Sequence, residues 1–135
     1  MFTSRTLVRT TIALVGLATL VAAARPRSAS ARLHTYLKKS EPAANDTLAA
    51  APHSVRLWFS ERVEIPVTTV KITDASGSAL SLGALARPDT GEAAPIVAAI
   101  AGSVRAGTYT VAWSTAAKDG HPAQGKFAFV VKAAS

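Results

Sequence analysis

Short runs in which apolar residues occupy every second position recur along the chain from residue 35 onward. Residues 55–59 (VRLWF) and 108–114 (TYTVAWS) each place three large apolar side chains on one side, which is the period-2 pattern of a half-buried strand. The same reasoning predicts strands at residues 35–40, 68–73, 79–82, 96–100 and 126–132. About seven strands in roughly 100 residues predict an all-β, immunoglobulin-like Greek-key sandwich or barrel.

The segments between these runs favour turns and loops. Residues 83–95 (GALARPDTGEAAP) contain two prolines and two glycines, which predict a loop. Residues 43–51 are alanine-rich but are interrupted by Asn-Asp-Thr and end before a proline, so we expect at most one helical turn there. Tyr109 follows a turn glycine at the start of a late strand, as in the tyrosine corner of Greek-key sandwiches, although an ordinary core tyrosine gives the same pattern.

The N-terminal 31 residues have a different character. Residues 1–11 contain two arginines and no acid, and residues 12–24 form an uncharged apolar run of 13 residues. A membrane span needs about 20 such residues, whereas the apolar core of a secretory signal needs about 7–15. Small-residue cleavage patterns follow at 22–24 and 29–31. We therefore expect residues 1–31 to be a cleaved signal peptide, rather than a membrane anchor or buried helix, and residues 32–135 to be one exported domain without a membrane span.

The charge of the chain is concentrated in this leader. The chain has 15 Lys and Arg against 8 Asp and Glu, a net charge of +7, and cleavage after Ala31 would remove four arginines and no acid to leave +3. The remaining bases are spread along the domain, which does not favour nucleic-acid binding. There is no cysteine, and Met1 is the only methionine. A disulfide framework and cysteine chemistry are therefore excluded, and no G-x-S-x-G or H-E-x-x-H pattern indicates a hydrolase.

Two histidines and one aspartate are the candidate metal ligands. Asp119 and His121 are two residues apart across Gly120, so in extended backbone their side chains leave on the same side. Such a pair binds a metal or forms a hydrogen-bonded acid–base pair, and taken alone the structural pair is the more common explanation. His34 follows the expected cleavage site, where an amine and an imidazole on one residue would chelate a metal, although taken alone a frayed terminal residue is the more common explanation. The third histidine, His53, precedes a strand and is expected to be solvated.

Four blocks of sequence together resemble the CopC-type periplasmic copper-binding proteins. Residues 34–42 (HTYLKKSEP) fit the H-x-x-L-x-x-S-x-P opening of that family, and residues 57–64 (LWFSERVE) resemble its L-x-F-S-E-x-V-E segment. Residues 107–113 (GTYTVAW) are similar to its G-x-Y-x-V-x-W block, and residues 119–122 match its D-G-H-P block. Order and spacing agree across essentially the whole exported part, so residues 32–135 resemble a CopC-like copper-binding domain.

This resemblance implies a periplasmic protein that binds one Cu(II) ion in copper homeostasis or resistance, sequestering it or passing it to a membrane transporter such as a CopD-type inner-membrane partner. The ligands would be the amine and imidazole of His34 together with Asp119 and His121. Glu61 matches the glutamate of the second block and would be an auxiliary or outer ligand, or only an exposed acid at a strand end. Nitrogen and oxygen donors suit Cu(II). The Cu(I) methionine site of some family members is not expected, because no methionine lies beyond Met1.

Two alternatives concern the donor set and the function. If cleavage leaves Arg32 first, His34 becomes the third residue and can bind Cu(II) with the terminal amine and two amides, in competition with Asp119 and His121. A binding protein without enzymatic activity is the leading hypothesis. The others are a copper-dependent oxidase with a histidine-brace-like centre and a metal-free immunoglobulin-like interaction module. An oxidase of that kind needs a broad flat substrate face, and most of the few aromatic residues fall on inward strand positions.

Overall fold

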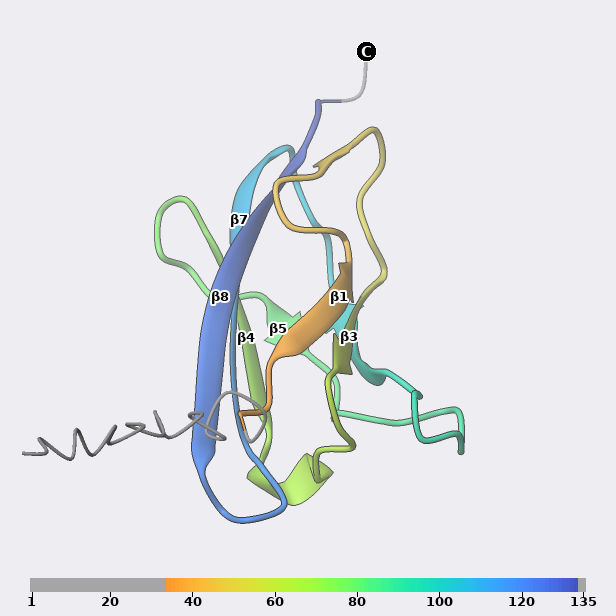
Figure 1. The fold of residues 1–135 in the computed structure, drawn as a ribbon. Helices are drawn as coiled ribbons and strands as arrows, with labels where there is room; N and C mark the ends of the chain where they lie inside the picture. Colours follow the sequence, from red (N-terminus) through yellow and green to blue (C-terminus); the bar gives the residue numbers. More distant parts are fainter. Residues whose placement is uncertain (1–33, 134–135) are drawn as a thin grey trace, which may run out of the picture.

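The computed structural model describes residues 34–133, so the expected signal peptide and Arg32 lie outside the described residues. Eight strands form two four-stranded sheets (Figure 1). Within the described range there is one short 3-10 turn, η2 (Ile65–Val67), and no helix is long and apolar enough to cross a membrane. The first sheet has the order β1 (Leu37–Glu41), β3 (Ser54–Phe59), β6 (Ile96–Ala101) and β5 (Ser81–Leu82), and the second has β2 (Thr47–Leu48), β8 (Pro122–Val131), β7 (Gly107–Ala116) and β4 (Thr69–Asp74).

The chain passes between the two sheets repeatedly. It leaves the first sheet after β3, returns to it after β4, and leaves it again after β6 to form the β7–β8 hairpin. Apart from the β2–β8 pair, neighbouring strands run antiparallel. The prediction of an all-β sandwich is therefore confirmed, with eight strands where about seven were expected.

The additional strand is β2, in the segment where we expected at most one helical turn. It is two residues long and pairs in parallel with the end of β8, Thr47 opposite Val130 and Leu48 opposite Val131. The Val130 N–H donates to the Asp46 carbonyl (2.9 Å), and the Lys132 N–H donates to the Leu48 carbonyl (2.9 Å). Alternation of apolar and polar residues cannot be recognised in a strand this short, so its pairing depends on the neighbouring strand.

The core lies between the two sheets and is built from the side chains that the alternation placed inward. Fully buried members come from β3, β4, β7 and β8, namely Val55, Leu57, Ile72, Val111 and Phe129. The Trp113 ring packs edge-on against Phe59, with 5.1 Å between ring centroids, and the Tyr109 ring stacks on Phe129 at 5.5 Å. Aromatic contacts of this kind add to the stabilisation from apolar burial. No disulfide is available, so this core is the main source of stability.

Tyr109 forms a tyrosine corner. Its hydroxyl donates to the Arg105 carbonyl (2.9 Å) and accepts from the Arg105 N–H (3.1 Å), while its ring is buried in the core. A hydrogen bond to the backbone a few residues upstream is the hallmark of this motif in Greek-key sandwiches. Of the two interpretations that the sequence left open, the corner is confirmed.

Gly125 provides space for the core tryptophan. It pairs with Trp113 across β7 and β8, and an added Cβ would lie 2.7 Å from Cζ2 and 2.9 Å from Cε2 of the indole. We expect Gly125→Ala to lower the free energy of unfolding by about 1–3 kcal/mol, because the buried indole must move against Phe59. Urea unfolding measures this change. Gly91→Ala is the control, since a Cβ at Gly91 meets nothing within 4 Å; equal stability of the two variants would contradict the prediction.

Candidate metal centre

The turn between β7 and β8 carries Asp119 and His121. Strand pairing ends at Ala116 and Pro122, and the turn is closed by the Ala117 N–H, which donates to the His121 carbonyl (2.9 Å). The Gly120 N–H donates to the Ala117 carbonyl (2.9 Å), and Gly120 has φ +85°, a left-handed conformation that favours glycine. The glycine between the two candidate ligands therefore serves the tight turn that presents both of them.

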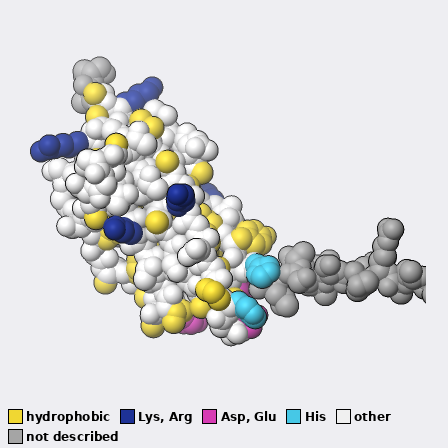
Figure 2. Space-filling view, turned by 90° about the vertical axis from the view of Figure 1, so that its left-hand side faces the viewer, with side chains coloured by type: hydrophobic (Ala, Val, Ile, Leu, Met, Phe, Trp, Pro, Cys, Tyr) yellow, Lys and Arg dark blue, Asp and Glu magenta, His cyan; other side chains and the backbone are white. Residues whose placement is uncertain are grey.

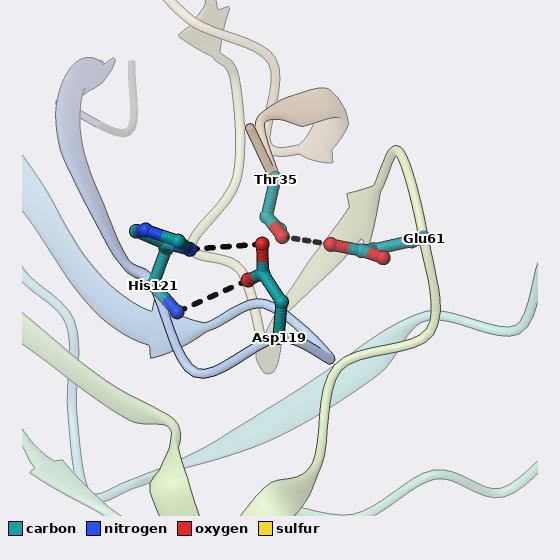
Figure 3. Close-up of polar contacts among 4 residues, drawn as sticks. All are labelled: Thr35, Glu61, Asp119 and His121. Atoms are coloured by element: carbon teal, nitrogen blue, oxygen red, sulfur yellow. Dashed lines mark hydrogen bonds and ion pairs between the residues drawn. The ribbon is translucent and has the colours of Figure 1, made fainter. Parts of the chain in front are cut away.

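Asp119 and His121 contact one another directly (Figure 3). His121 Nδ1 lies 2.8 Å from Asp119 Oδ2, and the His121 backbone N–H donates to Asp119 Oδ1 at 3.1 Å. The backbone N–H of His121, and next its side chain, lower the pKa of Asp119, so the carboxylate stays ionised well into the acidic range. The side chains of His121 and Asp119 are 69% and 42% exposed. The two side chains lie together as expected, but a tight turn brings them together and not the extended backbone on which the expectation was based.

This contact determines which atoms are available to a metal. Two acceptor atoms would not lie 2.8 Å apart, so Nδ1 of His121 carries the proton that it shares with Asp119. In a neutral imidazole the second ring nitrogen, Nε2, then has a free lone pair. A carboxylate has about four acceptor positions and uses two of them on His121, so Asp119 also retains lone pairs for a metal. Imidazole nitrogen and carboxylate oxygen together are suitable donors for Cu(II).

The segment that begins with His34 is fixed by the residues that follow β3. His34 is exposed, but the next residue, Thr35, is only 5% exposed, and its hydroxyl donates to Oε1 of Glu61. The Tyr36 N–H donates to Ser60 Oγ (3.1 Å), and the Ser60 N–H donates to the Tyr36 carbonyl (2.9 Å). The chain immediately after His34 is therefore held in place. Glu61 is half-buried and hydrogen-bonded, so it is not simply an exposed acid at a strand end.

Figure 2 shows histidine and acidic side chains gathered at one end of the molecule, whereas the lysine and arginine side chains visible on that face lie away from it. In Figure 3 dashed lines join Asp119 to His121 and Thr35 to Glu61. In the part of the chain that the structure describes, however, no three His, Asp or Glu side chains are close enough to hold a metal together. The structure thus joins Asp119 to His121 and Thr35 to Glu61, and it does not join His34 to either pair.

Two further residues, His53 and Ser60, complete the comparison with the sequence-based candidates. His53 is exposed, as expected, and its carbonyl accepts from the Ile100 N–H (2.9 Å). Ser60 was not among the candidate residues predicted from the sequence, although it contacts the leading segment directly. The signal that could have found it is its place between Phe59 and Glu61 in the second sequence block.

The model of the CopC domain family matches residues 37–132 of the chain. The protein belongs to the CopC family. Among its relatives, protein YobA of Escherichia coli K12 is 36% identical over 99 residues, covering 73% of this chain and 79% of that protein. Copper resistance protein C of Escherichia coli is 32% identical over 109 residues, with 76% and 85% covered. The family resemblance inferred from the four sequence blocks is confirmed.

The fold agrees with solved structures of this family. The crystal structure of PcoC, a methionine-rich copper resistance protein from Escherichia coli, matches with a TM-score of 0.64 and 31% identity, covering 73% of this chain and 99% of that one. Unlike a methionine-rich protein, the present CopC-family chain has no methionine beyond Met1.

Proposed function

We propose that this CopC-family protein binds one Cu(II) ion at the end of the sandwich where the β7–β8 turn meets the segment after His34. The Asp119–His121 pair carries this proposal, because it is already formed and leaves His121 Nε2 free. His34 supplies the remaining nitrogen donors, an imidazole and, after trimming to this residue, an amine. Relatives named copper resistance protein C support a role in copper resistance or homeostasis.

The chemistry of the donors favours Cu(II) over Cu(I). Imidazole, amine and carboxylate groups suit Cu(II), whereas Cu(I) prefers thioether or thiolate sulfur, and the chain has no sulfur beyond Met1. The ionised Asp119 offsets one of the two charges of the ion. We propose capture and release of copper rather than catalysis. Absence of reductant-dependent peroxide production by the copper-loaded protein supports this, and sustained production would favour the oxidase.

Export of the protein is part of the proposal. A signal peptide at residues 1–31 would deliver the domain to the periplasm, where it sequesters copper or passes it to a membrane transporter of the CopD type. The intact mass of the exported protein shows whether Arg32 or His34 is the first residue. An Arg32 terminus favours a four-nitrogen set from the amine, two amides and His34, and a His34 terminus favours the set with Asp119 and His121.

Competitive titration of the copper-free domain with Cu(II) tests the proposed function. We expect one ion per chain for a domain that starts at His34, bound tightly enough to compete with a chelator. A parallel titration of the domain starting at Arg32 reports on the four-nitrogen alternative. If neither form binds a divalent metal, the proposal fails and the metal-free interaction module is favoured.

The affinity for Cu(II) should fall as the pH decreases through about 6.5, the range in which imidazole ordinarily takes up a proton that competes with the metal. Asp119 does not cause this loss, because its pKa is lowered and the carboxylate is still ionised in that range. Competitive titrations at about one pH unit above and below this midpoint measure the effect. An affinity that is constant across this interval would contradict histidine ligation.

A further inference from the structure

Residues 60–68, which connect the two sheets, contact residues that lie next to both parts of the proposed copper site. At the start of this connection, Ser60 and Glu61 hold Tyr36 and Thr35. At its end, buried Thr68 hydrogen-bonds through its hydroxyl to the Thr115 hydroxyl (2.8 Å). Thr115 is the penultimate residue of β7, directly before the turn that carries Asp119 and His121. This connection therefore links the segment after His34 with the end of β7.

Arg87 anchors the middle of this connection. Its Nη2 donates to the Val63 carbonyl at 2.5 Å, and Val63 itself is buried. The residue before it, Ala86, is fixed to β6 by two backbone hydrogen bonds with Val97 (2.9 and 2.8 Å). Arg87 Nε is also buried, and within the described residues it has no hydrogen-bond partner. The hydrogen bond from Nη2 therefore ties the Val63 carbonyl to the segment that pairs with β6 of the first sheet.

We propose that Arg87 is a positioning residue for copper binding. By fixing Val63 it keeps Ser60 and Glu61 in register with Tyr36 and Thr35, and so fixes the position of the backbone next to His34. The role of Arg87 toward copper rests on the proposed function, whereas its effect on the segment around Thr35 does not. The loop of residues 83–95 thereby gains a role as a support for the site. A second hydrogen bond between this loop and residues 60–68, from Arg62 Nη1 to the Gly91 carbonyl, is longer (3.4 Å) and exposed.

Amide hydrogen exchange of the copper-free domain tests the structural half of this proposal. In Arg87→Met, which removes the donors but keeps an unbranched apolar stem, we expect the Tyr36 and Ser60 amides to exchange several-fold faster. The Val130 amide, bonded to the Asp46 carbonyl at the opposite pair of strands, should be unchanged. Arg56→Met is the matched control, because Arg56 is exposed and its side chain makes no hydrogen bond within the described residues. Unchanged exchange at Tyr36 and Ser60, or equal acceleration at Val130, would overturn the proposal.

Copper titration of the same variants tests the functional half. We expect Arg87→Met to weaken Cu(II) binding by about tenfold, the size seen when groups that orient metal ligands are removed, and Arg56→Met to leave it unchanged. Arg87→Lys retains a donor for the Val63 carbonyl and should recover part of the loss. Wild-type affinity in Arg87→Met would remove Arg87 from the site while leaving the proposed function intact. If the wild-type domain binds no copper, the proposed function fails and the exchange experiment still decides the positioning of Tyr36 and Ser60.

Discussion

Replacing His121 with alanine should lower the affinity for Cu(II) by more than about 100-fold, because even the loss of a group that only orients a metal ligand costs 10- to 100-fold. The variant removes the free Nε2 and also the ring that contacts Asp119 at 2.8 Å. The measurement is a competitive Cu(II) titration of the domain that starts at His34. His53→Ala is the matched control, since His53 is another exposed histidine of the same domain.

The result of this experiment distinguishes the two donor sets. Equal affinity of wild type and His121→Ala, in the domain that starts at His34, would remove the β7–β8 turn from the copper site. In the domain that starts at Arg32, a small effect of His121→Ala would instead indicate that the amine, two amides and the His34 imidazole hold the ion. Far-ultraviolet circular dichroism confirms that the variant is folded, and His121 is exposed enough for its loss to leave the fold intact.

The second large effect concerns the core. Phe129→Ala should lower the free energy of unfolding by about 3–5 kcal/mol, the range for removing a buried phenylalanine. Phe129 is 0% exposed, and its ring stacks on Tyr109 at a centroid distance of 5.5 Å. Urea unfolding of the copper-free domain measures the loss, with no contribution from metal binding.

Val130→Ala provides the comparison in the same strand. Val130 is 36% exposed and faces away from the core, so its truncation removes far less buried surface. We expect its effect on the unfolding free energy to be within about 1 kcal/mol. Equal losses of unfolding free energy in the two variants would contradict the assignment of Phe129 to the buried face of β8 and of Val130 to its exposed face.

The strands that could be predicted are those long enough to show which face is buried. Val55 and Leu57 alternate with polar Arg56, and Val111 and Trp113 alternate with Ala112, and the structure buries the four predicted inward side chains. Strand β2 has only two residues, which are too few to show an alternation of apolar and polar positions. Its pairing with Val130 and Val131 depends on β8, which lies more than 80 positions further along the chain.

The candidate site also has a part that could be predicted from the sequence and a part that could not. Asp119 and His121 could be paired from sequence, because only Gly120 separates them and the turn is local. The hydrogen bond of Thr35 with Glu61 spans 26 positions, and that of Arg87 with Val63 spans 24. Nothing in the local pattern around Arg87 indicates that it contacts the connection between β3 and β4. These contacts follow only from how the two sheets pack.

By itself, the amino-acid sequence determined the class of fold, the buried faces of the longer strands, the family, and the absence of sulfur ligands beyond Met1. These properties follow from residue identity and from short-range periodicity, which fold local segments in a predictable way. Only the tertiary structure decided that Glu61 holds Thr35, that Thr68 hydrogen-bonds to the end of β7, and that Arg87 donates to the Val63 carbonyl. Such contacts join segments that are distant in the chain, and their geometry is fixed only when the sheets pack around one core.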